Sequence, residues 1–441
     1  MRISIPSIPA SSEVGKAKHQ HTLQQAAEAV YEFLQKGVTE QQQQQQRLQG
    51  STSSASSRWT AQGKEQSSLA DERRSGTGAG TILMTGAGVS VDSGIAPYRG
   101  EGGHYEVHKT YRPIFFHEFV DSSEKGHIAR QRYWSRSFLG YPPVLVARPN
   151  KTHYAIAAMQ RLGAFADYIT QNVDSLHHMA TPSPSLAASS ILELHGTLQH
   201  VLCVSSPTPG SAPSRPKDPT LHSHLTQSHL SGPRLRAEPR PFNTPTGQAY
   251  PKGCGFRGSR SAYQSILAER NPMWDEMAKE MHQRGTQPKT NPDGDVELAR
   301  NTDYSSFHYP ACPSCGGVLK PGVVFFGESV PDALRDRSFE LVRRASQMLI
   351  VGSSTATYSA YRLAKTMHEA GGSVMILNKG PSRADPLASD KIELGSSEVL
   401  QLVAQRLAGT DRRKKDPVLD RLLTSGGPAL VPNSGVRVAA S

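Results

Sequence analysis

The sequence predicts an α/β fold, a Rossmann-like doubly wound parallel sheet with a smaller lobe inserted into it. Short apolar runs alternate with amphipathic stretches from residue 78 onward, which is typical of a parallel sheet covered by helices on both faces. A glycine-rich turn follows the first apolar run, as in nucleotide-binding folds. Two segments, at about residues 101–150 and 200–318, interrupt the alternation. We expect them to build the smaller lobe, with a ligand cleft between the lobes.

The chain has 441 residues, a net charge of +11 and four cysteines. That length is enough for one large domain or two medium ones with a self-sufficient core. The basic residues are scattered, and the densest run is Arg412-Arg413-Lys414-Lys415, so the charge favours solubility and weak steering over specific nucleic-acid binding. No apolar run approaches the length of a membrane span. Four cysteines are too few for a disulfide scaffold of this size.

Residues 1–77 form a predicted extension ahead of the sheet. Apolar residues at helical spacing predict a helix over residues 22–34 that packs on the folded domain. A glutamine run follows at 41–46, and the Ser- and Gly-rich tract at 50–76 is expected to be disordered. The first residues are Ser-rich and acid-poor but also poor in arginine, which fits a mitochondrial transit peptide only loosely.

Five apolar runs are predicted strands, at residues 82–85, 168–170, 323–326, 348–351 and 374–378. Helix-like, aromatic sequence fills the insert at about 101–150. The Pro-, Ser- and His-rich insertion at about 204–253 is expected to be disordered, and the tail at 411–441 to be flexible and basic. The predicted folded domain therefore spans residues 78–410.

The turn after the first predicted strand contains Gly86-Ala87-Gly88, and Ser90 follows. Glycines after a strand let the backbone approach a phosphate, and the next helix offers free N–H groups. Val91 stands where the dinucleotide fingerprint requires its third glycine, which argues against a nicotinamide dehydrogenase. Taken alone, the pattern fits an ordinary strand–turn–helix junction equally well.

Two cysteines form a C-x-x-C pair, Cys312 and Cys315, followed by Gly316 and Gly317. This spacing is typical of a zinc-ribbon knuckle, in which glycines free backbone N–H groups toward sulfur. A redox disulfide within the pair is the alternative. The residues around the pair are neither basic nor aromatic enough for a zinc-ribbon nucleic-acid module.

The glycine turn resembles the cofactor loop of the sirtuins, which are NAD-dependent protein lysine deacylases. Further motifs of that family follow in its order, and the resemblance spans about residues 78–405. These motifs are Gly94-Ile95-Ala96-Pro97-Tyr98-Arg99, Gln171-Asn172-Val173-Asp174, Leu194-His195-Gly196, Val351-Gly352-Ser353-Ser354, Leu377-Asn378-Lys379-Gly380 and Gly395-Ser396. Arg112-Pro113-Ile114 and Pro292-Asp293-Gly294-Asp295 are most similar to the mitochondrial class II type.

The resemblance implies catalytic roles for His195 and Asn172. His195 would be the general base toward a ribose hydroxyl, and Asn172 would position the ribose and a bound water. The segment 323–328 would pair with the extended substrate peptide. The residues placed around NAD+ are Gly86, Ala87, Gly88, Ser90, Tyr98, Arg99, Gln171, Asn172, Asp174, Gly352, Ser353, Ser354, Asn378, Lys379, Gly380 and Ser396.

The resemblance also bears on the metal. The sequence after Cys254 is similar to the family sequence that follows the second zinc cysteine, so an insertion of roughly fifty residues would separate it from Cys203. Cys203, Cys254, Cys312 and Cys315 would then hold one structural Zn2+. A metal-free variant is the alternative.

The implied function is NAD-dependent protein lysine deacylation, of deacetylase or lipoamidase type, in which the acyl group passes to ADP-ribose and nicotinamide is released. The implied partners are acyl-lysine proteins, with no specific nucleic acid and no membrane, and the expected location is the mitochondrial matrix, with cytoplasm or nucleus as the alternative. Mono-ADP-ribosyl transfer or a catalytically weak NAD-binding sensor is the competing reading, because Ala96-Pro97 replaces the family's Pro-Asp. The sequence does not indicate the oligomeric state.

Overall fold

A computed structural model describes residues 21–53, 80–100, 102–107, 112–165, 167–205, 218–227, 253–286, 288–299 and 301–424. Within these residues the larger lobe is built on a six-stranded parallel sheet, in the order β3-β2-β1-β7-β8-β9. Its strands are β1 (Thr81–Thr85), β2 (Tyr168–Thr170), β3 (Ile191–Glu193), β7 (Gln347–Val351), β8 (Ser373–Leu377) and β9 (Asp390–Ile392). The strand order reverses between β1 and β7, which is where open parallel sheets bind their ligands.

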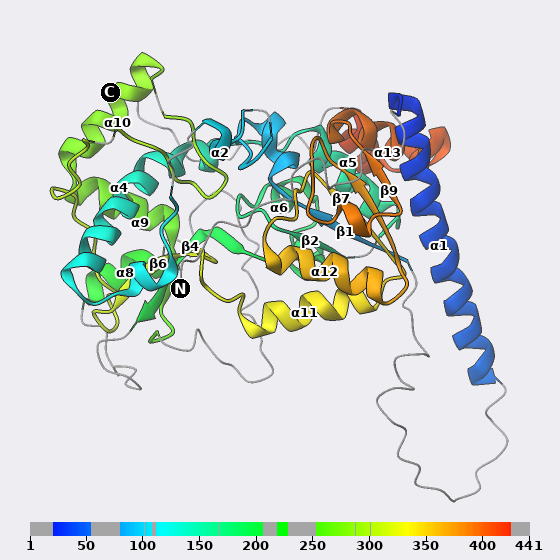
Figure 1. Cartoon of the computed structure of the whole chain (residues 1–441), viewed down its shortest axis with the longest axis horizontal. Coiled ribbons are helices and arrows are strands. Elements are labelled where there is room, and N and C mark those ends of the chain that lie inside the picture. The colour runs from blue at the N-terminus through cyan, green and yellow to red at the C-terminus, as the bar shows by residue number, and fades with distance from the viewer. Residues whose placement is uncertain are drawn as a thin grey trace, which may run out of the picture.

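Helices cover both faces of this sheet (Figure 1). Alternate residues of β1 point to opposite faces, so Leu83 joins one core while Ile82 and Met84 join the other. The helices on the Leu83 side are α1 (Leu23–Ser53), α5 (Lys151–Arg161), α13 (Ser396–Lys415) and α14 (Pro417–Thr424). The opposite face packs against α11 (Asp332–Arg343) and α12 (Tyr358–Glu369). Short helices α6 (Leu176–Ala180) and α7 (Pro184–Ser190) connect β2 to β3, and the 3-10 turns are η1 (Ala87–Ser93) and η3 (Asp385–Leu387).

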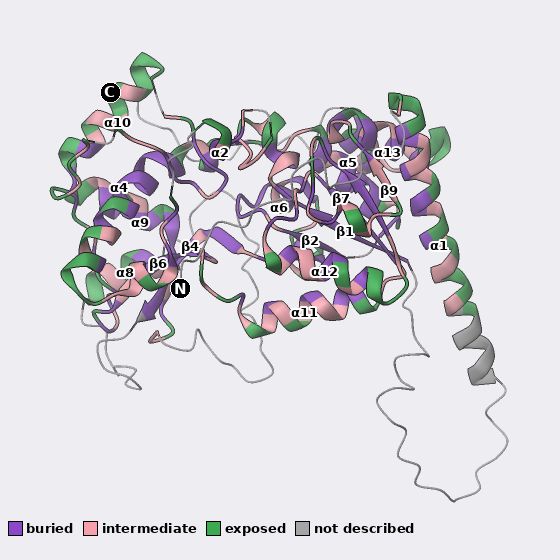
Figure 2. Ribbon diagram, in the orientation of Figure 1, coloured by how far each residue is buried: buried purple, intermediate pink, exposed green. Residues whose placement is uncertain are grey.

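The smaller lobe has its own core around Trp134, Tyr263 and Phe307, all buried. Figure 2 shows buried stretches of ribbon in this lobe. Its three-stranded antiparallel sheet has the order β5-β4-β6. The elements of the lobe are α2 (His104–Val107), α3 (Phe116–Val120), α4 (Glu124–Val146), β4 (Gly196–Ser205), α8 (Pro219–Gln227), β5 (Arg257–Ser259), α9 (Arg260–Arg270), α10 (Pro272–Arg284) and β6 (Val318–Val323). Strand β4 leaves the large lobe directly after β3 and so joins the two lobes.

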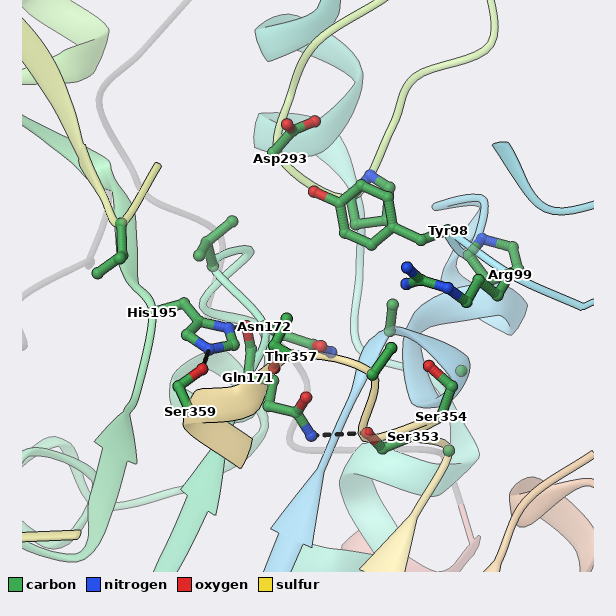
Figure 3. Close-up of a pocket in the computed structure, with 18 of the residues that line it drawn as sticks. Tyr98, Arg99, Gln171, Asn172, His195, Asp293, Ser353, Ser354, Thr357 and Ser359 are labelled. Carbon is green, nitrogen blue, oxygen red and sulfur yellow. Dashed lines mark hydrogen bonds between the residues drawn. The ribbon is translucent and has the colours of Figure 1, made fainter. Parts of the chain in front are cut away.

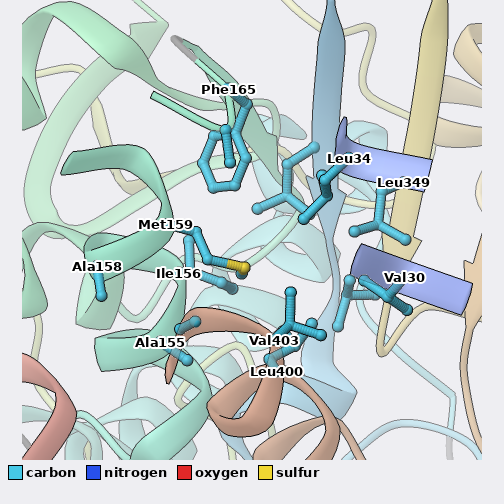
Figure 4. Close-up of a cluster of buried hydrophobic side chains, with 14 of the residues drawn as sticks. Val30, Leu34, Ala155, Ile156, Ala158, Met159, Phe165, Leu349, Leu400 and Val403 are labelled. Carbon is cyan, nitrogen blue, oxygen red and sulfur yellow. The ribbon is translucent and has the colours of Figure 1, made fainter. Parts of the chain in front are cut away.

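The N-terminal helix is longer than the sequence predicted. The expected helix at 22–34 is part of α1, which continues through the glutamine run to Ser53. Glutamine is a good helix former, and extending an existing helix is much easier than starting one. Ala26, Val30 and Leu34 are buried against the large lobe, which confirms the expected packing; Figure 4 shows Val30 and Leu34 in this cluster. The rest of the 50–76 tract, beyond Ser53, lies outside the described residues.

Two segments expected to lack structure contain helices. The flexible tail predicted at 411–441 is wrong for residues 411–424, because α13 and α14 extend through them and Leu419, Leu422 and Leu423 are buried. The disordered insertion predicted at 204–253 is wrong at residues 219–227, where α8 buries Leu225 in the small-lobe core. In both cases isolated apolar residues find a partner surface that the local sequence does not reveal.

One predicted strand is displaced. Strand β6 ends at Val323, whereas the strand was expected at 323–326. Beyond it only Phe326 forms a single bridge, to Phe115.

The described helices include none with both the length and the apolar character that crossing a membrane requires.

Candidate active site

A cavity of about 1000 Å3 lies at the carboxyl ends of β1, β2 and β7, where the two lobes meet. Both lobes contribute to its wall, and Figure 3 shows part of the lining. The predicted site residues that line it are Ala87, Gly88, Tyr98, Arg99, Gln171, Asn172, His195, Gly352, Ser353, Ser354, Asn378, Lys379, Gly380 and Ser396. The other three, Gly86, Ser90 and Asp174, are not among the lining residues.

The glycine turn packs directly against the turn that follows β7. The Gly88 amide donates a hydrogen bond to the Gly352 carbonyl at 2.8 Å. A Cβ atom at Gly88 would lie 2.8 Å from that oxygen and 2.9 Å from the Gly352 Cα, so only glycine fits at this contact. Gly352 has a φ of +59°, in the left-handed region that glycine adopts without strain. The glycines thus let two neighbouring turns meet at the cavity. The segment that follows Gly86 is a 3-10 helix of seven residues rather than an α-helix.

Asn172 is held by a buried polar chain behind the cavity wall. Its amide donates to the Ser90 hydroxyl at 3.1 Å, and Ser90 donates to the Asp174 carboxylate at 2.7 Å. The Leu176 amide also donates to Asp174. Burial raises the pKa of Asp174, while these hydrogen bonds oppose the shift. Ser90 and Asp174 therefore fix the orientation of Asn172, which alone of the three lines the cavity.

Gln171 links β1 to the turn after β7. Its side-chain amide donates to the Ser353 hydroxyl at 2.7 Å (Figure 3) and to the Thr85 carbonyl at 3.2 Å. The Thr355 amide also donates to the Ser353 hydroxyl. These contacts hold Ser353 in place at the cavity wall.

His195 follows β3 and is partly exposed to the cavity. Its Nδ1 lies 3.1 Å from the Gln171 carbonyl oxygen, so Nδ1 carries the proton and donates it. Its Nε2 lies 2.8 Å from the Ser359 hydroxyl and accepts from it. Burial lowers the pKa of His195 to about 4, although the Gln171 carbonyl favours the charged form. The ordinary pKa of a histidine is 6.5, and desolvation accounts for the difference.

The loop between η1 and α2 keeps its aromatic and basic side chains at the cavity despite Ala96-Pro97. The His104 amide donates to the Pro97 carbonyl at 2.9 Å. The Tyr98 and Tyr105 rings stack at 5.7 Å, and the Arg99 guanidinium lies 4.9 Å from the centre of the Tyr105 ring. Burial lowers the pKa of Arg99, with the two tyrosines opposing the shift.

The opposite end of the cavity is formed by the turns after β8 and β9. Asn378 donates to the carbonyls of Lys379 and Gly380, at 3.0 and 3.1 Å. The Ser396 hydroxyl lies 2.8 Å from that of Thr152 at the start of α5. Sequence reasoning quoted Asp293 and Asp295 in a family motif without giving them a site role. It missed other lining residues because no quoted motif marks them: Asp92, Tyr133, Thr357, Ser359 and Arg362.

The four cysteines meet in the small lobe, far apart in sequence but close in space. Their Sγ atoms all lie within 4.8 Å of one another, with Cys203 to Cys315 at 3.5 Å and Cys254 to Cys312 at 3.6 Å. Tetrahedral Zn2+ with bonds near 2.3 Å would separate its sulfur ligands by about 3.8 Å. The Gly317 amide donates to the Cys315 sulfur, as a thiolate ligand requires. The residues present therefore fit one structural Zn2+, and no disulfide joins them in the described structure.

Comparison with known proteins is consistent with this arrangement. The sequence matches the Sir2 family over residues 86–236 and 264–359. It is 40% identical over 330 residues to the NAD-dependent protein deacylase SIR4 of Batrachochytrium dendrobatidis, covering 74% of this chain and 90% of that protein. It is 33% identical over 325 residues to the NAD-dependent protein lipoamidase sirtuin-4, mitochondrial, of Bos taurus, covering 74% and 82%. A solved complex of a Sir2 homologue with NAD is 22% identical with a TM-score of 0.43, covering 74% of this chain and 88% of that one.

Proposed function

Because the chain belongs to the Sir2 family of sirtuins, we propose that it is an NAD-dependent protein lysine deacylase. The observation that carries the proposal is the meeting of His195, Asn172 and Ser353 at one cavity that both lobes line. The relatives named above are themselves called deacylase and lipoamidase. When bound, NAD+ would supply the ribose that receives the acyl group and nicotinamide as the leaving group.

The cavity fits a dinucleotide in size and in lining. Its volume of about 1000 Å3 is at the upper end of small-molecule sites. The glycines Gly88 and Gly352 leave room for the phosphates to approach the turns, Ser354 offers them a hydroxyl group, and Asn378 and Ser396 lie at the adenosine end. The buried Thr357 hydroxyl also lines the cavity and has no hydrogen-bond partner among the described residues, so it is available to a bound molecule.

The proposed base is the neutral imidazole of His195. Because Nδ1–H is held by the Gln171 carbonyl, the Nε2 lone pair remains to accept a proton from a hydroxyl group placed where the Ser359 hydroxyl now lies. The pKa of about 4 keeps the ring neutral, and therefore able to accept a proton, throughout the physiological range. Asn172, fixed by Ser90, would orient the ribose beside it.

The proposed peptide site is the segment that follows β6. The Val324 amide donates to the His195 carbonyl at 2.8 Å, and the Phe116 amide donates to the Phe326 carbonyl at 2.9 Å. This segment is therefore extended and anchored to both α3 and the catalytic histidine, and it lines the cavity. An extended acyl-lysine peptide would add to it as a further strand.

We further propose a lipoamidase-type activity in the mitochondrial matrix, on the strength of the bovine relative's name. The test is incubation of the purified protein with NAD+ and acetyl-, lipoyl- and longer acyl-lysine peptides, following nicotinamide release and peptide mass. We expect His195→Ala to reduce turnover by about 10²- to 10⁴-fold, the usual contribution of a general base, while NAD+ binding remains. His308→Ala, at an exposed histidine of the small lobe, is the control.

Acyl loss that does not depend on NAD+ or on His195 would refute the proposal. NAD+-dependent ADP-ribosylation without acyl loss would favour the transferase alternative. Binding of NAD+ without any reaction would favour a sensor.

A further inference from the structure

Behind the cavity wall, three polar side chains link the two chain segments that carry Asn172 and His195. Asn172 lies on the segment that follows β2, and His195 lies between β3 and β4. The Ser175 hydroxyl donates to the Glu193 carboxyl at 2.8 Å and lies 2.9 Å from the Thr197 hydroxyl. None of these three side chains lines the cavity, so none of them is placed to touch a substrate.

The cluster lies close in sequence to both proposed catalytic residues. Ser175 is three residues beyond Asn172, while Glu193 and Thr197 flank His195 at a distance of two residues on either side. Ser175 and Thr197 are buried, and the Glu193 side chain is 13% exposed. A shift of any of the three side chains would therefore be passed along a short stretch of backbone to Asn172 or to His195.

Backbone hydrogen bonds already hold the two segments side by side. The Leu194 amide donates to the Thr170 carbonyl at 2.8 Å, and the Leu198 amide donates to the Val173 carbonyl at 2.9 Å. The side-chain cluster adds a contact at the turn that comes next, where the chain leaves this pairing and enters α6 at Leu176. The position of that turn relative to β3 and β4 is thus set by side chains.

Ser175 adopts a backbone conformation that is strained for a serine. Its φ of +58° lies in the left-handed region, which glycine adopts freely and other residues adopt at a cost. Its side chain does not cap α6, because the Leu176 amide donates to Asp174 instead. The strained turn therefore directs the Ser175 hydroxyl across to the segment that carries His195.

Glu193 accepts the Ser175 hydrogen bond mostly as a neutral carboxyl group at pH 7. Burial raises the pKa of Glu193 to about 8. The Ser175 hydrogen bond and Arg257 oppose this shift, and Asp174 adds to it. The Nδ1 atom of His178 lies 3.5 Å from the same carboxyl oxygen, but burial lowers the pKa of His178 to about 4, so the two groups do not form an ion pair at pH 7. An uncharged amide of the same shape can therefore stand in for this carboxyl group.

We infer that Ser175, Glu193 and Thr197 are positioning residues that set the placement of Asn172 relative to His195. This inference rests on the proposed deacylase function. A misplacement of reacting groups by about 1 Å can lower a rate by about 100-fold. Loss of the cluster should therefore reduce turnover although the cluster itself contacts no substrate.

The first test is Ser175→Gly, because glycine keeps the left-handed turn without strain and removes the hydroxyl. We expect kcat for an acyl-lysine peptide with NAD+ to fall about 10- to 100-fold, while the Kd for NAD+, measured by calorimetry, stays unchanged. Ser183→Gly is the matched control. Its hydroxyl also makes a hydrogen bond, with the Leu186 amide at the start of α7, but it does not line the cavity, so neither value should change.

A pair of substitutions at Glu193 separates the hydrogen bond from the space that the side chain fills. Glu193→Gln keeps an oxygen for the Ser175 hydroxyl and, like the protonated carboxyl, carries no charge, so it should retain most of the turnover at pH 7. Glu193→Ala should lower kcat as far as Ser175→Gly does. A loss in Glu193→Gln as large as that in Glu193→Ala would overturn the role assigned to the hydrogen bond.

Amide hydrogen exchange followed by mass spectrometry reports the link between the segments independently of activity. In Ser175→Gly, exchange should become faster at Leu194 and Leu198 but not in α13. An unchanged kcat, or a lower kcat with equally weakened NAD+ binding, would overturn the inference. If the unsubstituted protein converts no acyl peptide, the deacylase proposal fails and exchange alone decides: faster exchange retains the cluster as the link between the two segments, and unchanged exchange overturns it.

Discussion

Replacing Leu34 of α1 by alanine tests whether the N-terminal helix is part of the folded core. Leu34 is fully buried and packs in the cluster that contains Leu349 of β7 and Val403 of α13 (Figure 4), and Leu83 of β1 belongs to the same cluster. The substitution removes three carbon atoms, worth about 2.4 kcal/mol at 0.8 kcal/mol for each buried methylene. The cavity left behind adds to this, so we expect a total loss of about 2–5 kcal/mol in the free energy of unfolding.

The same helix supplies the control. Leu23, in its first turn, is 40% exposed, so Leu23→Ala should change the free energy of unfolding by less than about 0.5 kcal/mol. Both substitutions place alanine in a helix, and the difference between them therefore isolates burial from helix propensity. The measurement is urea unfolding followed by far-UV circular dichroism, in which the midpoint falls by the lost free energy divided by the slope m.

Equal midpoints for Leu34→Ala and Leu23→Ala would refute the reasoning, because they would show that α1 does not pack on the sheet. One hydrogen bond agrees with this packing, since the side-chain amide of Gln347 at the start of β7 donates to the Phe33 carbonyl. Affinity for NAD+ should be the same in both variants, because no residue of α1 lines the cavity.

Three further results are expected. Removal of Zn2+ by a chelator, or Cys254→Ser, should lower the unfolding midpoint and release one zinc per chain; a chelator without effect would contradict the four-cysteine site. Gly88→Ala should weaken NAD+ binding at least about tenfold in calorimetry, because its Cβ would meet the Gly352 backbone at 2.8 Å; unchanged affinity would contradict the packing. His153 is fully buried and its pKa is lowered to about 3, so its share of stability is lost as pH falls below about 6.5. Between pH 6.5 and 4 the free energy of unfolding of His153→Gln should therefore fall less steeply with pH than that of the unsubstituted protein, by up to about 1.4 kcal/mol per pH unit. An unchanged slope would contradict the role assigned to His153.

The strands at the centre of the large sheet could be predicted because each is a short run of apolar residues, as a strand buried on both faces requires. β1, β2, β7 and β8 are apolar runs that end in turn residues. β6 was misplaced because it contains Lys320 and Pro321, which do not look like strand residues. Lys320 is buried there because Glu328 pairs with it at 3.0 Å, a contact made across a turn that local sequence does not specify.

The candidate site likewise contains some residues that the local sequence predicts and others that it does not. His195, Asn172 and Gly88 were identified because each stands in a recognisable motif at the end of a strand. Ser359 was not, because it reaches the cavity only through the packing of α12, whereas Asp293 was quoted in a motif but given no site role. A residue that reaches the cavity through tertiary placement alone leaves no local signal, so the wall formed by α12 is where the structure adds most.

Strand β4 explains how a zinc site remote from the chemistry could still govern it. The strand begins immediately after His195, and Cys203 lies on it eight positions beyond that histidine, a span of roughly 26 Å in an extended strand. At that distance the metal cannot polarise a bound substrate, so any effect it has must pass through the backbone. Gly196 pairs with Val323 of β6, and the Val324 amide donates to the His195 carbonyl. The knuckle Cys312–Cys315 anchors the other end of β6, which begins at Val318. Loss of Zn2+ should therefore loosen the histidine and the proposed peptide segment together, and lower both kcat and peptide affinity before it alters NAD+ binding at the large lobe.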